Sequence, residues 1–246
     1  VLSIDEFQGN ADNEKFQCIL TDPLHRRILD ILPGRQDYRI SSYLRSFPPE
    51  EREKVKYIVM DMNRAYLATM KDVFPKANIV IDRFHVVRQC VWAIENVRKR
   101  IQKNLPKEQR RYFKRSRKLL LAHMQKLNDE SKEALNVMLA FSDDLTKAYL
   151  LKELFYKFIA ASDRHQAVKR LLEFRLQAHI ANLKEFEPVM TMLSNWEPYI
   201  LNTFDFPFSN GFTEGCNNKI KVLKRIAFGY RNFEHFRKRI ILSFLH

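Results

Sequence analysis

The sequence predicts an α/β protein: a mixed five-stranded sheet of three antiparallel and two parallel strands, flanked by helices and interrupted by a large all-helical insertion. Three observations lead to this prediction. The first third of the chain carries short apolar runs separated by turn residues. Two of these runs, 56–62 and 78–82, are joined by a helical pattern, which is typical of parallel neighbours. Residues 104–200 contain no glycine and no convincing strand pattern.

Three apolar runs open the chain, at 1–7, 16–22 and 26–33. Residues 8–15 are turn and surface types, and residues 22–25 (Asp-Pro-Leu-His) read as a tight turn. Strands that are joined by such short connections pair antiparallel. We therefore expect these three runs to form an antiparallel meander.

The next part of the chain predicts two helices and two strands. Apolar residues at near-helical spacing indicate a helix over 36–47, which a Pro-Pro pair ends. The strand 56–62 leads into a helix over 63–73 that Asn63 caps, and the strand 78–82 follows. Because strand–helix–strand connections make parallel pairs, we expect these two strands to extend the meander into a mixed sheet.

Helical patterns continue after residue 82. Apolar residues recur every three or four positions over 84–103, with Arg and Lys on the outer side. Capping residues separate the patterns that follow. These lie near 107–127, 131–141, 143–161, 164–184 and 187–202. We therefore expect a core in two pieces, 1–103 and 201–246, around an all-helical insertion at 104–200.

The stretch 209–225 predicts a helix with two different faces, followed by Gly229 as its C-cap. The buried stripe, at steps of three and four, is Cys216, Ile220, Leu223 and Ala227. The opposite face carries Glu214, Asn218, Lys221 and Arg225. A last helix is predicted from about Asn232, and its core side is Phe233, Phe236, Ile240 and Phe244.

The charge balance favours a polyanionic partner. The chain has 43 Lys and Arg against 29 Asp and Glu, a formal charge of +14, and the basic residues are spread through folded-looking segments. This indicates a basic surface on a globular body that suits DNA or RNA, and an anionic membrane surface less well. The chain contains no run of about 18 apolar residues, so we expect no membrane span. The three cysteines are far apart, so we expect free thiols and neither a zinc site nor a disulfide.

Acids punctuate three of the predicted strands, at Asp5, Asp61 and Asp82. A single acid at a strand end commonly marks only where the chain reaches the surface. Asp5 and Asp61 each follow an unbroken apolar run, however, as in a strand that is buried on both faces. If their strands are neighbours, the two carboxylates lie side by side, which is costly without a cation and typical of a Mg²⁺ site. Glu214, in the first turn of its helix, has the position to complete such a site.

Asp82 has three interpretations that the residues leave open. It caps the helix that follows, it is an extra acid near the metals, or it forms a D-x-x-H ligand pair with His85. His85, Arg88 and Trp92 share one helix face, where we expect Arg88 to contact DNA and Trp92 to pack. A second tryptophan, Trp196, is expected in the core.

Amide and basic residues surround Glu214 and predict a DNA-contact surface, with an ordinary solvated face as the alternative. They begin one turn from Glu214, and amides are uncommon choices for a purely solvated helix. The residues concerned are Asn217, Asn218, Lys221, Lys224 and Arg225. Arg231, together with Arg83, His85 and Arg88, completes the candidate DNA-binding set. Backbone N–H groups near Gly211 to Gly215 can also receive a phosphate at the helix start.

Several strings resemble one known family. SIDEF, ILDILPGR, VMDMNRAY, IVIDRFHVV and, above all, SNGFTEGCNNKIKVLKRIAFGYRNFEHFRKRI are similar to the ISL-three family of bacterial insertion-sequence transposases. The element order with Asp, Asp and a late Glu likewise resembles the RNase H-like catalytic fold of DDE transposases and retroviral-type integrases. The resemblance runs over nearly the whole chain and is weakest in the helical insertion.

The resemblance implies that Asp5, Asp61 and Glu214 are the acidic triad of a metal-dependent DNA strand-transfer enzyme. The implied cofactor is Mg²⁺, with two ions expected and Mn²⁺ as a substitute, and no small-molecule cofactor. The implied partner is double-stranded DNA, both transposon ends and target, bound by a homodimer or larger assembly in the bacterial cytoplasm at the nucleoid. Family members usually carry a zinc-binding segment and a helix-turn-helix before the first catalytic strand. The chain resembles the part of these proteins that follows such segments, so we expect it to be the catalytic half.

Two other functions remain open at this point. One is a non-catalytic DNA-binding protein, a domesticated or decayed transposase core, although the acids at all three positions favour an enzyme. The other keeps the fold and the metals but makes the protein a plain nuclease. An absence of metal binding that depends on Asp5 and Asp61 would favour the non-catalytic protein. Joined strand-transfer products, and not nicks alone, would distinguish a transposase from a plain nuclease.

Overall fold

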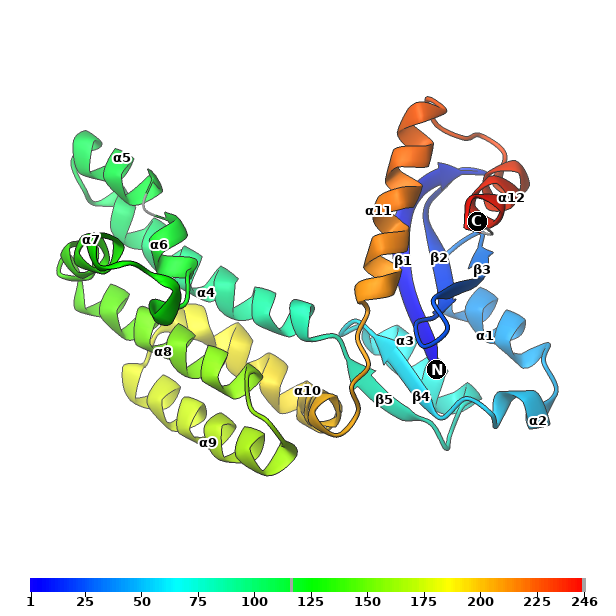
Figure 1. Ribbon diagram of the computed structural model, residues 1–246, viewed down its shortest axis with the longest axis horizontal. Coiled ribbons are helices and arrows are strands. Elements are labelled where there is room, and N and C mark those ends of the chain that lie inside the picture. The colour runs from blue at the N-terminus through cyan, green and yellow to red at the C-terminus, as the bar shows by residue number, and fades with distance from the viewer. Residues whose placement is uncertain (116, 245–246) are drawn as a thin grey trace. The chain divides into compact units, whose positions relative to one another are not determined.

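The computed structural model describes residues 1–115 and 117–244 and divides the chain into two compact units (Figure 1). One unit combines Val1–Asp82 with Phe206–His246, and the other is Arg83–Asp205. These boundaries differ from the expected divisions at 103/104 and 200/201. The reason is that the long helices at both ends of the insertion pack with the helices inside it.

The first unit contains the predicted five-stranded mixed sheet. Its strands are β1 (Leu2–Ala11), β2 (Glu14–Asp22), β3 (Arg27–Leu32), β4 (Tyr57–Met60) and β5 (Asn78–Ile81). Their order is β3-β2-β1-β4-β5, with antiparallel pairs among the first three and parallel pairs from β1 to β4 and from β4 to β5. The predicted meander with two added parallel strands is therefore confirmed.

The first hairpin is longer than the sequence pattern predicts. Residues 8–15 were expected to form a turn, yet β1 runs to Ala11 and β2 starts at Glu14. The connection is tight because Asn10, Asp12 and Asn13 all adopt positive φ angles. Asn and Asp are the residues that tolerate this left-handed backbone best after glycine. The turn-forming residues thus predicted correctly that the chain turns here. They did not predict how far the two strands extend toward the turn.

In the described residues, five helices complete the first unit. They are α1 (Asp37–Arg45), α2 (Pro49–Arg52), α3 (Arg64–Val73), α11 (Gly211–Ile226) and α12 (Phe233–Ser243). The side chain of Asn63 accepts hydrogen bonds from the backbone of Ala65 and Tyr66, and Asn232 caps α12 in the same way through His235. The predicted cap Asn63 is confirmed, and the last helix begins after Asn232 as predicted.

Helices α11 and α12 cover one face of the sheet. Phe7, Ile19 and Ile31 of the first three strands share a buried cluster with residues of these helices. The helical members of the cluster are Cys216, Ile220, Phe233, Phe236 and Ile240. The predicted core side of the last helix is thereby confirmed, with Phe244 partly buried at its edge. The predicted stripe on α11 is correct for its first half only, since Ala227 is exposed.

The second unit is a bundle of helices. They are α4 (Arg83–Lys103), α5 (Lys107–Arg115), α6 (Arg117–Leu121), η1 (Met124–Lys126), α7 (Asp129–Leu139), α8 (Asp143–Ile159), α9 (Arg164–Ala181), η2 (Lys184–Phe186) and α10 (Glu187–Asp205). Within the described residues the unit has no strand, as predicted. The helix expected near 107–127 is divided into α5, α6 and η1, and residue 116 of that range lies outside the described residues.

The core of the helical unit is aromatic. Phe155 of α8 meets Phe158 and Phe174 edge to face, with ring centroids 5.8 and 5.1 Å apart. Trp196 is buried as expected, whereas Trp92, which was expected to pack, is 49% exposed beneath the guanidinium of Arg88. None of the described helices combines the length and apolar character that a membrane crossing requires.

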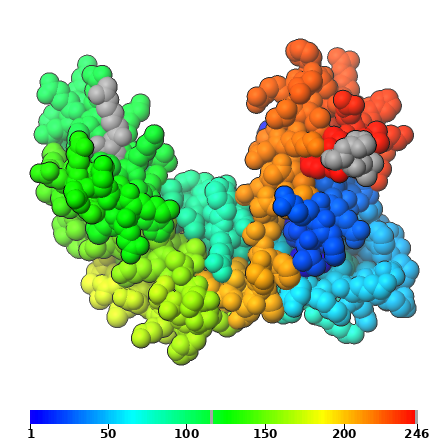
Figure 2. Space-filling view, in the orientation of Figure 1, coloured from blue at the N-terminus to red at the C-terminus, as the bar shows by residue number. Residues whose placement is uncertain are grey.

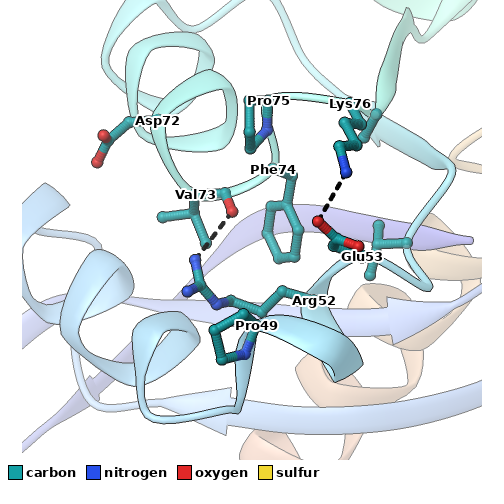
Figure 3. A pocket seen from close by; sticks show the side chains of 10 residues that line it. Pro49, Arg52, Glu53, Asp72, Val73, Phe74, Pro75 and Lys76 are labelled. Atoms are coloured by element: carbon teal, nitrogen blue, oxygen red, sulfur yellow. Dashed lines mark hydrogen bonds and ion pairs between the residues drawn. The ribbon is translucent and has the colours of Figure 1, made fainter.

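A pocket in the first unit lies between α2 and the end of α3 (Figure 3). Arg52 donates to the backbone oxygen of Val73 at 3.2 Å, and Lys76 pairs with Glu53 at 2.7 Å across its rim. Neither Asp5, Asp61 nor Asp82 lines this pocket. The acids that the sequence singles out therefore belong to a different part of the unit.

Candidate active site

Three aspartates occupy equivalent register positions on three neighbouring strands: Asp61 and Asp82 directly follow β4 and β5, and Asp5 lies within β1. In the parallel ladder from β1 to β4, Ile4 pairs with Met60, and in the ladder from β4 to β5, Met60 pairs with Ile81. The residue after each of these partners is an aspartate: Asp5, Asp61 and Asp82. The parallel register therefore places the three residues in one row across the sheet, at the carboxyl ends of β4 and β5 and beside them on β1.

Asp61 and Asp82 are close neighbours in this row, since carboxylate oxygens of the two residues lie within 4.8 Å of each other. Asp82 is almost fully buried, at 5% exposure, and its Oδ1 accepts the backbone N–H of Asn210 at 3.4 Å. The backbone N–H of Asp82 donates to the carbonyl oxygen of Met60 at 3.1 Å, which extends the β4–β5 ladder by one residue. Asp82 is thus held on the sheet beside Asp61.

Glu214 lies in the first turn of α11, and α11 packs on β1 (Figure 1). A buried polar network fixes this turn. The Thr213 hydroxyl lies 2.9 Å from the Ser3 hydroxyl on β1 and 2.8 Å from the Thr21 hydroxyl on β2, and Ser3 also donates to the side-chain oxygen of Asn210. Glu214, the next residue after Thr213, is half-buried. The network therefore fixes the backbone from which the side chain of Glu214 extends.

Asn217, one turn further along α11, contacts the acid row directly. Its side-chain nitrogen donates to Oδ2 of Asp5 at 2.8 Å, while the backbone N–H of Glu6 donates to Oδ1 at 2.7 Å. Asn217 is only 7% exposed. Of the predicted DNA-contact residues on this helix, Asn217 thus lies on the side of the sheet and the acids.

The other predicted residues of α11 lie on its outer side. Asn218, Lys221 and Arg225 are exposed, as the helical spacing predicts. Lys224 is half-buried, and its ammonium donates to the backbone oxygen of Gln8 on β1 at 2.6 Å. Figure 2 shows the surface of α11, in orange, open to solvent on this face of the unit. A groove at the end of the helix is lined by Lys221, Lys224, Arg225 and Arg231 among others.

The predicted DNA-contact residues of α4 belong to the helical unit. Arg83 is half-buried there and donates to the hydroxyl and the backbone oxygen of Thr203 at 3.1 and 2.6 Å. Burial lowers the pKa of its guanidinium. These contacts tie the start of α4 to the end of α10. His85 follows two residues later beside the ring of Phe84, and Arg88 is exposed.

The donor set around Asp61 suits a hard divalent cation. Carboxylate oxygens are the ligands that Mg²⁺ and Mn²⁺ prefer. Two carboxylates within 4.8 Å of each other repel unless a cation or a proton intervenes. The three cysteines, Cys18, Cys90 and Cys216, are free and buried.

The sheet order, the acid row and the helix that contacts Asp5 are those of an RNase H-like α/β core with carboxylates on its neighbouring strands β1, β4 and β5. The family model for ISL-three DDE transposases, described as "Transposase", matches residues 2–240. The chain therefore belongs to this family.

Individual relatives agree with the family. The chain is 31% identical over 251 residues to the transposase for insertion sequence element IS1001 of Bordetella parapertussis, which covers 99% of this chain and 60% of the relative. It is 23% identical to the transposase for IS1557 of Mycobacterium tuberculosis, over 94% of this chain and 57% of the relative. The chain thus spans about three fifths of the length of these curated relatives.

Sequence reasoning missed two features of this site. The sequence left Asp82 with three interpretations, although the register puts it directly beside Asp61. The signal that could have placed it was the pair of short apolar runs, each of which ends in an acid. Asn217 was grouped with the exposed residues, although it lies four positions after Thr213 and three before Ile220, both of which are buried. The helical spacing from these two residues is enough to predict that Asn217 lies on the buried side of α11.

Proposed function

We propose that this chain is the catalytic part of a DDE transposase that cleaves DNA at transposon ends and joins the freed ends to target DNA. The observation that carries the proposal is the row formed by Asp5, Asp61 and Asp82 across neighbouring strands, with Glu214 on the helix whose Asn217 bonds to Asp5. Membership of a transposase family supports the reaction class. An acid row of this kind has no use in a purely structural sheet, because its charges repel.

In this proposal Asp5, Asp61 and Glu214 hold divalent metal, with Asp82 as a fourth acid beside Asp61. Mg²⁺ or Mn²⁺ at such carboxylates supplies Lewis-acid stabilisation of the attacking and leaving oxygens of a phosphoryl transfer. The chain's own task is to hold the acids in place. Asn217 does so for Asp5, through its hydrogen bond, and the Ser3–Thr213–Thr21 network does so for the turn that carries Glu214.

The proposed reaction has two steps of the same chemistry. In the first step a water oxygen attacks the phosphorus at the transposon end, the P–O3′ bond breaks, and a free 3′-OH and a 5′-phosphate result. In the second step that 3′-OH attacks a phosphorus of target DNA, and the target strand leaves with its own 3′-OH. Neither step needs an oxidant, a reductant or a covalent enzyme intermediate.

The outer side of α11 provides the DNA surface in this proposal. Asn218, Lys221 and Arg225 are exposed beyond the acid row, and Lys224 and Arg231 line the groove at the helix end. Cations placed in this way neutralise phosphates, so DNA affinity falls steeply with salt. We assign Asn217 to positioning of Asp5, and Arg83 to the helical unit, on the basis of their hydrogen bonds.

The decisive experiment uses Asp61→Asn in the full-length protein. This change keeps the size and one oxygen of the side chain but removes the charge at the centre of the row. We expect Mn²⁺-dependent nicking of a supercoiled plasmid to be abolished while DNA affinity, measured by fluorescence anisotropy, is unchanged. The matched control is Asp37→Asn, which removes an exposed acid in the first turn of α1 and keeps wild-type nicking.

Three outcomes decide among the functions. Metal-dependent nicking that persists in Asp61→Asn rejects the assignment of the active site. Wild-type protein that binds DNA but never nicks it, with no Mn²⁺ binding that depends on Asp5 and Asp61, identifies a DNA-binding protein without catalysis. Nicks without joined strand-transfer products identify a plain nuclease.

A further inference from the structure

Phe228 stands fully exposed at the end of α11. Its side chain has 100% relative exposure, and its φ angle is +54°. Two hydrogen bonds define the turn: the N–H of Phe228 donates to the carbonyl of Arg225 at 3.1 Å, and that of Gly229 donates to the carbonyl of Lys224 at 2.8 Å. This is a Schellman ending, in which Phe228 occupies the left-handed position. Gly229, predicted as the cap, is one residue further on.

A phenylalanine at this position carries two costs. The left-handed position of a Schellman ending is normally glycine or asparagine, because a Cβ crowds the backbone there. The ring also remains in water, so it contributes no burial in return. Backbone strain in a non-glycine residue is a feature that functional sites retain. The fold itself gains nothing from the ring of Phe228.

The ring is surrounded by positive charge. Phe228 lines a groove with Lys221, Lys224, Arg225 and Arg231, and no acid is among the described residues that line it. The other aromatic of the groove, Tyr230, stacks on Phe236 with ring centroids 4.5 Å apart and planes 15° apart. Tyr230 is thereby anchored to the core cluster. Phe228 is left as the aromatic of this groove that faces solvent.

We propose that Phe228 stacks on an unpaired base of DNA whose backbone lies along this groove. The proposal rests on the proposed function, and it names what the end of α11 recognises. Lys and Arg neutralise the phosphates, while the ring meets the flat face of a base. Bases inside a duplex have both faces covered by their neighbours, so the ring distinguishes unpaired from paired DNA. The occupant is a single-stranded or melted segment, which strand cleavage and joining produce.

The test compares two fluorescein-labelled probes of equal length and equal ends, a fully paired duplex and the same duplex with a central three-base bubble. Anisotropy gives the affinity of the full-length protein for each probe. We expect Phe228→Ala to weaken binding to the bubble by about 5- to 100-fold, the range of one base–aromatic stack. Affinity for the duplex and the salt dependence for both probes should not change, because no charge is removed. Phe228→Trp should restore the preference for the bubble.

Two further variants keep the test independent of folding. Phe228→Asn suits the left-handed backbone, so it should unfold no earlier than wild type in a thermal melt, yet it should lose the preference for the bubble. Ile226→Ala removes a nearby apolar side chain, the last residue of α11, which is 71% exposed and does not line the groove. This variant should keep the preference for the bubble.

Equal loss on both probes in Phe228→Ala, or no loss on either, overturns the role of Phe228 while the proposed function stands. Failure of the wild-type protein to bind either probe overturns the proposed function itself.

Discussion

The side chain of Asn217 donates a hydrogen bond to Oδ2 of Asp5, 2.8 Å away, and so joins α11 to β1 at the acid row. The backbone N–H of Glu6 holds the other oxygen of Asp5 at 2.7 Å. A carboxylate with both oxygens engaged in this way has a fixed orientation. Partners that orient a metal-binding carboxylate typically change metal affinity or activity by about 10- to 100-fold when they are removed.

Asn217→Ala is therefore expected to raise the Mn²⁺ concentration needed for half-maximal DNA cleavage by about 10-fold or more. DNA affinity should remain at the wild-type value, because the side chain is buried beside Asp5 and does not reach the outer side of the helix. A Mn²⁺ titration of plasmid nicking measures the first quantity, and anisotropy measures the second. Asn218→Ala, on the exposed neighbour, is the matched control. It should keep the wild-type Mn²⁺ requirement and weaken DNA binding. An unchanged metal requirement in Asn217→Ala would show that Asp5 needs no such support.

The Thr213 hydroxyl is expected to matter for stability. It is fully buried and lies within 2.9 Å of the hydroxyls of Ser3 and Thr21. Thr213→Val keeps the shape but leaves both partners with one hydrogen bond fewer, so we expect the free energy of unfolding to fall by about 1–3 kcal/mol. Urea unfolding followed by circular dichroism measures this change. Thr213→Ser keeps the hydroxyl and should lose less, and a Thr213→Val variant that is as stable as wild type would show that the hydroxyl network does not stabilise the fold.

Much of the sheet could be predicted from the sequence because it depends on local signals. Apolar runs of four to eight residues fix the strands, and short turns or a helix between them fix the pairing direction. Strand length at the first hairpin could not be predicted, since Asn and Asp serve equally as the tip of a long hairpin and as a loop. The boundaries of the helical unit could not be predicted either. Whether α4 packs on the sheet or on α8 is decided by long-range contacts that its periodicity does not contain.

The candidate site shows the same division. Glu214 and its exposed neighbours follow from helical spacing, which is local. The closeness of Asp61 and Asp82 follows from the register of β4 and β5, and register depends on pairing between strands. Phe228 was not singled out, because Gly229 beside it offered the expected cap. Its exposure and left-handed backbone become visible only when the end of α11 is known.

Asp30 predicts a pH dependence of stability. Burial alone would raise the pKa of its carboxyl group, but hydrogen bonds from Arg237, Tyr43 and the backbone N–H of Ile31 together hold that pKa below its ordinary value. The Arg237 Nε–Asp30 Oδ1 distance is 2.6 Å, and it joins α12 to β3. A lowered carboxyl pKa contributes stability that is complete above the unfolded-state pKa, near 4, and is lost as the pH falls through the folded-state pKa.

Arg237→Met removes this pairing, and we expect it to lower the free energy of unfolding by about 2 kcal/mol at pH 7. The difference between variant and wild type should shrink as the pH is lowered below 4, because Asp30 becomes protonated in both proteins. Urea unfolding at a series of pH values measures it. Lys238→Met, on the exposed neighbour of the same helix, should cost little at any pH. A difference that stays constant down to pH 3 would mean that Arg237 acts through packing of its stem.

Asp82 offers the last prediction, because its carboxylate lies within 4.8 Å of that of Asp61 and yet is absent from the expected triad. Asp82→Asn keeps an oxygen that can accept the backbone N–H of Asn210, so the loop before α11 stays in place. Removing one of two close negative charges should raise the melting temperature of the metal-free protein. The same change should weaken cleavage by about 10- to 100-fold, and raised Mn²⁺ should restore much of it. Asp61→Asn should not be rescued, since it removes the acid at the centre of the row. If Asp82→Asn neither stabilises the metal-free protein nor weakens cleavage, Asp82 serves only to hold the start of α11.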